Sequence, residues 1–218
     1  AETASASVAA NCELMSVSAA NGVWIIGVGG RVAGQCLGGQ GPGVLGASRA
    51  WTHDGYEIAF TTADGINGQA STNAIEAVNI STGAVRTLVT STGPDYAFNP
   101  RWAPDGRQIV VSIERFATTA VTDCTPIGSA VAVVDLAVQD PKPRLLTDMA
   151  TFADYPDWSP DGTKIVFTTI DLGTRDAGCA EFPLGSSDLY VIKPDGTGLT
   201  QLTHNPSGKT PIRAVRGV

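Results

Sequence analysis

Trp158-Ser159-Pro160-Asp161-Gly162 is a five-residue block that recurs in related form along the chain. The other copies are Trp51-Thr52-His53-Asp54-Gly55 and Trp102-Ala103-Pro104-Asp105-Gly106, which gives periods of 51 and 56 residues. Asp bonds its own downstream backbone and Gly accepts a positive φ, so each block predicts a tight turn. Each block leads after two residues into an apolar triplet typical of a strand, at 58–60, 109–111 and 165–167. A turn and strand repeated at this period indicate a repeat architecture.

Two further strand-like runs follow in each repeat. The third strands are expected at 75–80, 131–136 and 189–192, and the fourth at 85–89, 144–146 and 199–202. Four short antiparallel strands with their turns need roughly 40 to 50 residues, the size of one propeller blade. The sequence therefore predicts an all-β propeller of four-stranded antiparallel blades, with repeats near 49–98, 99–155 and 156–209. Trp51, Trp102 and Trp158 are expected to pack between neighbouring blades.

The repeat resembles that of the TolB-like propeller family. The segment 158–203 carries W-S-P-D-G-x-x-I-x-F, a strand of the I-Y-V type, a D-G turn and a closing L-T. The other copies depart from this pattern at His53, Ala103 and Val111. The resemblance covers roughly residues 49 to 206 and implies an extracytoplasmic scaffold that binds a protein or glycan partner.

The two ends of the chain are predicted to form a fourth, degenerate blade, with residues 1–10 as a disordered segment. Strands are expected at 14–17, at 23–28, and at 32–37 or 44–45, and residues 210–216 of the C-terminal segment 210–218 would add the innermost strand. The domain would then span 11–218 as a four-bladed monomer, since an unpaired blade edge needs closure. The alternative is a half-ring of three blades that completes six blades in a homodimer, or with a missing portion of a larger protein.

Charge and cysteines limit the function classes. The net charge is -7 and the sequence pI is about 4.7, without clusters of Lys and Arg, so no nucleic-acid partner is expected. No apolar run approaches the roughly 20 residues that cross a bilayer, so no membrane insertion is expected. Four cysteines without CxxC spacing favour disulfides and a secreted or periplasmic location. Equivalent loops would pair Cys124 with Cys179, and Cys12 would pair with Cys36.

The long connections at 61–73, 112–129 and 168–187 are expected on one face of the propeller, where recognition usually occurs. The binding residues proposed there are Asp95, Tyr96, Arg115, Asp154, Tyr155, Asp171 and Arg175. His53 and His204 form no ligand pair and no GxSxG motif is present, so no metal, cofactor or catalytic residue is predicted. This pattern favours a binding scaffold over an enzyme; a polysaccharide lyase or hydrolase, or a fragment of a larger propeller, is the alternative.

Overall fold

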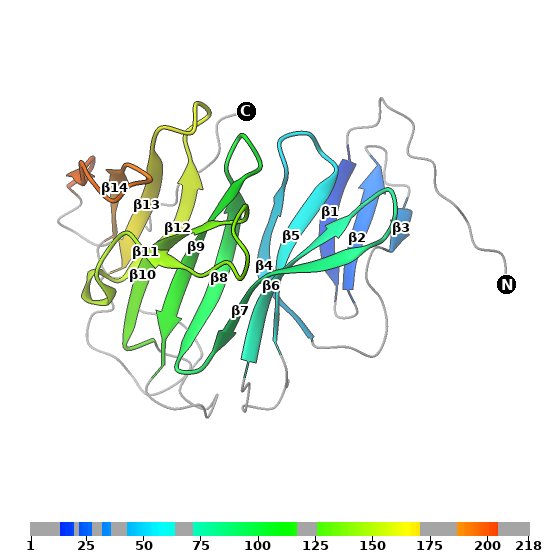
Figure 1. Cartoon of the computed structure of the whole chain (residues 1–218), viewed down its shortest axis with the longest axis horizontal. Helices are drawn as coiled ribbons and strands as arrows, with labels where there is room; N and C mark the ends of the chain where they lie inside the picture. Colours follow the sequence, from blue (N-terminus) through cyan, green and yellow to red (C-terminus); the bar gives the residue numbers. More distant parts are fainter. Residues whose placement is uncertain are drawn as a thin grey trace, which may run out of the picture.

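The architecture is all-β, with its strands in four antiparallel sheets (Figure 1). The computed structural model describes residues 14–19, 22–27, 32–35, 43–63, 72–116, 126–170 and 187–204. The N-terminal segment 1–10 and the C-terminal segment 210–218 of the expected closing blade lie outside these residues, so both remain predictions.

Three of the sheets have four strands each, paired in chain order, and we call them blades 1, 2 and 3. Blade 1 comprises β4 (Gly43–Trp51), β5 (Glu57–Ala63), β6 (Thr72–Asn79) and β7 (Val85–Thr92). Blade 2 comprises β8 (Asp95–Trp102), β9 (Gln108–Arg115), β10 (Gly128–Asp135) and β11 (Arg144–Leu145). Blade 3 comprises β12 (Ala153–Trp158), β13 (Ile165–Ile170), β14 (Ser187–Ile192) and β15 (Thr200–Gln201). The predicted four-stranded antiparallel blades are confirmed, although the first strands of all three start a few residues before the expected repeat boundaries.

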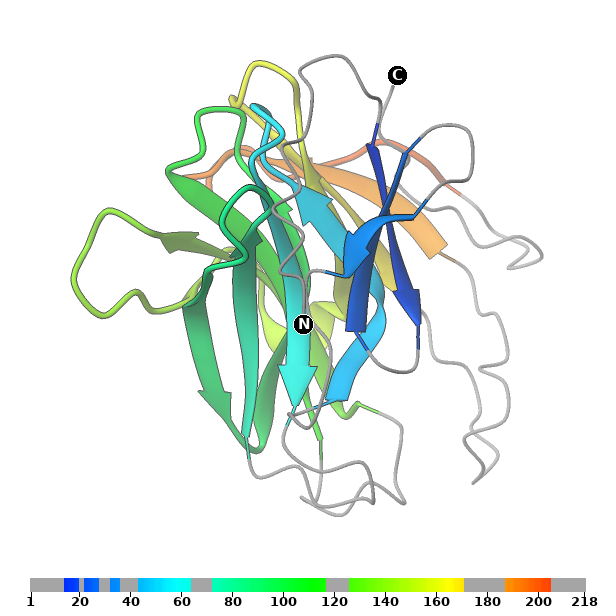
Figure 2. The same ribbon diagram turned by 90° about the vertical axis from the view of Figure 1, so that its right-hand side faces the viewer.

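The fourth sheet is smaller and lies beside blade 1. It consists of β1 (Leu14–Ala19), β2 (Gly22–Gly27) and β3 (Val32–Gln35), paired antiparallel in that order. β1 and β2 contact β4, and Figure 2, in which this sheet faces the viewer in blue, shows it next to the first blade. Strands were therefore correctly expected in this segment, whereas Val44 and Leu45 belong to the first strand of blade 1.

The repeated five-residue blocks form the tight corners between the first and second strands of each blade. In blade 3, Asp161 Oδ1 accepts hydrogen bonds from Ser159 Oγ at 2.6 Å and from the Thr163 amide at 3.0 Å. These donors, the Ser159 hydroxyl first, lower the pKa of Asp161 to about 2. Gly162 closes the turn at φ 69°. All three corners lie at the same end of the sheets, the upper end in Figure 1, which we call the corner end.

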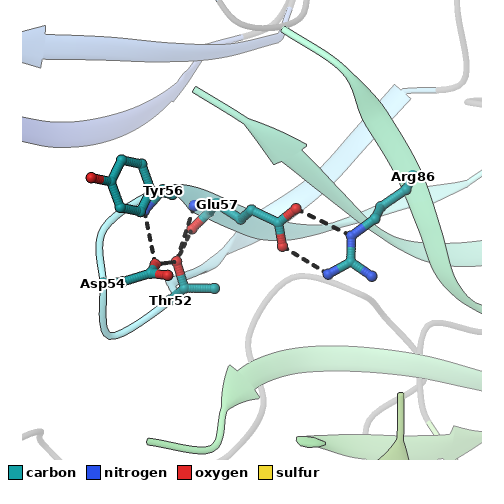
Figure 3. A network of polar contacts seen from close by, with 5 residues as sticks. All are labelled: Thr52, Asp54, Tyr56, Glu57 and Arg86. Carbon is teal, nitrogen blue, oxygen red and sulfur yellow. Dashed lines mark hydrogen bonds and ion pairs between the residues drawn. The ribbon is translucent and has the colours of Figure 1, made fainter. Parts of the chain in front are cut away.

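The corner of blade 1 is also tied to its outer strand (Figure 3). Thr52 Oγ1 donates to Asp54 Oδ1 at 2.6 Å and accepts from the Glu57 amide at 3.0 Å, so threonine performs the role that Ser159 has in blade 3. Glu57 then accepts two hydrogen bonds from the Arg86 guanidinium, at 3.2 and 2.7 Å. The departures from the family repeat at this corner therefore leave its geometry intact.

Replacing Gly106 with alanine is expected to lower the free energy of unfolding by about 1 to 2 kcal/mol, the cost of the left-handed conformation for a residue with a Cβ. Gly106 has φ 69°, and a Cβ there would meet no atom within 4 Å, so backbone strain alone is tested. Gly106→Asn is the matched control, since asparagine adopts this region more readily. Urea unfolding measures both variants, and equal losses would contradict this explanation.

The core consists of two apolar clusters, one on each side of blade 2. Alternation along β9 sends Ile109, Val111 and Ile113 toward blade 1, whereas Val110 packs with Ile165 and Phe167 of blade 3. Trp102 is 3% exposed in the first cluster and Trp158 is 9% exposed in the second, as predicted. Trp51 is only half-buried. The blades therefore stack face to face, as in a propeller.

The two outer faces of this stack differ. Ala59 and Ala77 belong to the cluster toward blade 2, so alternation turns the fully buried Ile58, Phe60 and Val78 to the opposite face of blade 1. The small sheet β1–β3 lies on that side of blade 1 (Figure 1). Val166 and Val191, which form a register pair in blade 3 equivalent to buried Val110 and Val133 in blade 2, are only half-buried. The described residues thus form part of a propeller, and the number of blades in the ring remains a prediction.

Candidate functional site

The end of the sheets opposite the corners, which we call the loop end, holds the described members of the predicted site. Because each blade is an antiparallel meander, β8 and β12 start there and β9 and β13 end there. Asp95, Tyr96, Arg115, Asp154 and Tyr155 all lie on these parts of the strands. Asp171 and Arg175 lie outside the described residues and remain predictions.

Asp95 and Arg115 form a two-pronged ion pair across β8 and β9. They are register partners, and Arg115 donates from Nε and an Nη to the two oxygens of Asp95, at 2.6 and 2.7 Å. The carboxylate raises the pKa of Arg115 by its hydrogen bond and its charge. Both side chains are more than one third exposed, so the pair contributes little to stability. It presents a fixed, accessible cation and anion at the loop end.

Tyr96, the neighbour of Asp95 in β8, lies in the interior beside this exposed pair. Its side chain is 7% exposed, and its ring meets Phe116 edge to face, with the centroids 5.9 Å apart. Phe116 immediately follows β9, and its amide donates to the Pro94 carbonyl. Tyr96 therefore fixes the chain where the long connection leaves blade 2, and its ring does not lie on the surface.

Asp154 is the centre of a buried polar network between blades 2 and 3. It is 5% exposed, and its Oδ1 accepts from Asn99 Nδ2 of β8 at 2.9 Å and from Ser112 Oγ of β9. The Tyr155 amide donates to the same oxygen at 2.7 Å. The network fixes the start of blade 3 against blade 2.

Glu114 faces this network and was not predicted from the sequence. Alternation along β9 places it on the side of Ser112, toward blade 3. Glu114 is half-buried. Desolvation of its carboxyl group and, second, the negative charge of Asp154 raise its pKa to about 8. Glu114 is therefore held in its protonated form near neutral pH. The sequence does contain a signal for this site. Ser112 and Glu114 follow Val110 at alternate positions of β9, so two polar side chains lie on the strand face that Val110 buries.

The two predicted Asp-Tyr pairs are not equivalent in the structure. Aligned on the tryptophans at their strand ends, Tyr155 corresponds to Asn99, not to Tyr96. Tyr155 and Asn99 both have φ near 50°, and both sit at register shifts before a proline. Such a conformation is frequent for asparagine and unusual for tyrosine. The bulge at Tyr155 turns the neighbouring Asp154 into the network described above.

A pocket opens between the outer parts of blades 1 and 2 at the loop end. Its volume is about 280 Å³. Blade 1 contributes Ser91 and Thr92, whereas Asp95, Ile113, Pro143, Leu145 and Met149 come from blade 2 and the 3-10 turn η1 (Met149–Thr151). One wall is therefore hydroxyl-bearing and the other mostly apolar.

The described part of the chain holds no cluster of three or more His, Cys, Asp or Glu side chains placed to bind a metal. Within the same residues, no helix is long and apolar enough to span a membrane. Cys12, Cys36, Cys124 and Cys179 lie outside the described residues, so both disulfides remain predictions.

Comparison with solved structures finds β-propellers. TolB from Acinetobacter baumannii matches with a TM-score of 0.56 and 21% identity, over 84% of this chain and 37% of that one. An oligogalacturonate lyase in complex with manganese matches with a TM-score of 0.56 and 15% identity, over 83% and 45%. A structure of a nidogen/laminin complex matches with a TM-score of 0.56 and 11% identity, over 90% and 63%. No family model and no curated protein matches the sequence.

The chain thus covers less than two thirds of each of these propellers. At such identities the likeness concerns the fold and leaves ligands and activity open. It agrees with the resemblance seen in the repeated W-x-P-D-G block. The chain has the TolB-like β-propeller fold.

Proposed function

We propose that this chain is an extracytoplasmic binding scaffold that holds a protein partner at the loop end of its blades. The observation that carries the proposal is the exposed Asp95–Arg115 pair on a rigid base at that end. Below it, Tyr96 and Phe116 fix blade 2, and the Asp154 network joins blade 2 to blade 3. An accessible charge pair on a preorganised surface gives specificity and orientation to a protein complex.

The fold neighbours support a protein partner without identifying it. One of the matching structures is a nidogen/laminin complex, an assembly of proteins. The predicted disulfides and the likeness to TolB support a location outside the cytoplasm.

A carbohydrate-active enzyme is the second candidate, and the Asp154–Glu114 pair favours it. A carboxyl group whose pKa is raised to about 8 beside a second carboxyl group is one component that an acid-base mechanism at a glycosidic bond requires. However, Asp154 is 5% exposed, and one of its oxygens already accepts three hydrogen bonds. A buried carboxylate with three hydrogen bonds is suited to stabilising the interface between blades and is poorly accessible to a substrate. We therefore prefer the scaffold.

Affinity capture from an extract of the producing cells tests the proposal, with Arg115→Glu compared with wild type. Arg107→Glu is the matched control, since this exposed arginine lies at the corner end. We expect wild type and Arg107→Glu to capture the same amount of one partner protein. Arg115→Glu should capture at least about tenfold less of it. Equal enrichment by all three, or cleavage of a polysaccharide that Glu114→Gln abolishes, would contradict the scaffold.

A further inference from the structure

The outer strand of blade 1 differs from those of the other two blades. β7 has eight residues, whereas β11 and β15 have two each. Among the described strands, β7 pairs only with β6, so its other edge carries a row of main-chain N–H and C=O groups. Proteins usually blunt such an edge, because it is a template for another strand.

Several of the usual protective features are missing from β7, although its pairing with β6 is irregular between Thr87 and Val89. Its sequence, VRTLVTST, has no proline and no lysine. Its one charged residue, Arg86, is engaged with Glu57. Thr87, Thr90 and Thr92 are exposed and uncharged. By contrast, β11 is short and follows Pro141 and Pro143. Among the described residues, the long edge of blade 1 is thus unpaired, whereas the edge of blade 2 is shortened.

The pocket between blades 1 and 2 begins where this edge ends. Ser91 is the register partner of Asn73, whose amide donates to the Ala97 carbonyl of β8 at 2.7 Å, so this side of β7 faces blade 2. Ser91 and Thr92 line the pocket together with Leu145, which is 48% exposed. A strand added to β7 would project alternate side chains toward this cavity.

The size and lining of the pocket define the side chain that fits. Its volume of about 280 Å³ lies just below the range of roughly 300 to 1,000 Å³ for small-molecule sites, so it suits a single side chain. The wall on the blade 2 side includes Ile113, Leu145 and Met149, and the one charged lining residue, Asp95, is already bonded to Arg115. An uncharged apolar side chain therefore fits best.

We propose that the β7 edge binds an extended peptide segment of a partner protein as a fifth strand of blade 1, with one apolar side chain of the peptide in this pocket. Main-chain hydrogen bonds along β7 supply affinity, and the pocket supplies specificity, as in other cases of strand addition. The pocket includes Asp95 of the loop-end pair, but the hydrogen-bonding edge runs along β7, so the inference does not require the loop end to be the main binding surface.

Selection from a phage-displayed library of linear 12-residue peptides on the whole chain tests the proposal. The best peptide is then synthesised in three forms: unmodified, and N-methylated at alternate amides in each of the two frames. Fluorescence anisotropy compares their affinities for wild type, Thr90→Lys, Leu145→Asp and the control Gln139→Lys. Gln139 is exposed in the turn after β10, far along the chain from β7, and its replacement adds the same charge.

We expect N-methylation in one frame to weaken binding about tenfold or more and the other frame to have little effect, because alternate peptide N–H groups face the β7 edge. Thr90→Lys and Leu145→Asp should weaken binding similarly, and Gln139→Lys should not. Failure to select a peptide, or equal tolerance of both N-methylated frames, would overturn the proposal. A concentration-dependent dimer that Thr90→Lys abolishes would also overturn it, since a second copy would then occupy the edge.

Discussion

Replacing Trp102 with alanine is expected to lower the free energy of unfolding by about 3 to 5 kcal/mol, the range for emptying a large aromatic site in a core. Trp102 is 3% exposed and packs in the cluster between blades 1 and 2, where the Arg86 guanidinium lies 5.7 Å from its ring centroid. Its Nε1 is buried and has no hydrogen-bond partner among the described residues, so the variant loses packing and gains no new unpaired donor.

The repeat supplies the control for this prediction. Trp51 stands at the same place in blade 1 but is only half-buried, so Trp51→Ala should cost clearly less than Trp102→Ala. Urea unfolding followed by far-UV circular dichroism gives both values on the same signal. An equal loss of unfolding free energy in the two variants would show that the tryptophan stabilises the tight turn beside it and not the packing between blades.

The stability of the protein is expected to fall as the pH rises from about 4.5 to about 8, and Glu114→Gln should remove this fall. In the folded protein the pKa of Glu114 is raised to about 8 by burial and by Asp154, whereas an unfolded glutamate ionises near about 4.3. Between these values the unfolded chain binds fewer protons than the folded one, so the free energy of unfolding decreases with pH.

Glutamine keeps the size and polarity of Glu114 without its charge. At pH 8 the variant should therefore be more stable than wild type by about 1 to 3 kcal/mol, and near pH 4.5 the two should agree. Asp140→Asn is the control, since this carboxylate is 75% exposed and its positive φ suits asparagine. Denaturant titrations at several pH values measure the difference. A variant as pH-dependent as wild type, or less stable at pH 8, would contradict the raised pKa.

The blades could be predicted from the sequence because their corners are local. The Asp-Gly turns depend on residues within a few positions, and Gly55, Gly106 and Gly162 all have the expected positive φ. The apolar triplet after each corner then defines the second strand. Burial of a given tryptophan depends on which blade lies opposite, and local sequence does not show that; Trp51 was therefore expected to be as buried as Trp102.

The candidate site was less predictable because it is assembled across blades. The sequence predicts Asp154 as a binding residue in a connection between blades, but its hydrogen-bond partners Asn99 and Ser112 lie 55 and 42 positions away in the sequence. Glu114 becomes unusual only through burial beside Asp154. Tyr96 was selected for its aromatic ring, and alternation along β8 turns that ring inward. Only the strand pairing seen in the structure distinguishes exposed side chains, such as Arg115, from side chains that connect neighbouring blades, such as Asp154.

Site-specific photo-crosslinking tests the central claim most directly, because it compares the two ends of the blades in one protein. Ile127 at the loop end and Val138 at the corner end are matched positions, with exposures of 49% and 51%. Each is replaced in turn by benzoylphenylalanine, and the protein is irradiated in an extract of the producing cells. The scaffold hypothesis predicts a discrete protein adduct from position 127 and none from position 138; adducts from 138 alone, equal adducts from both, or none from either would contradict it.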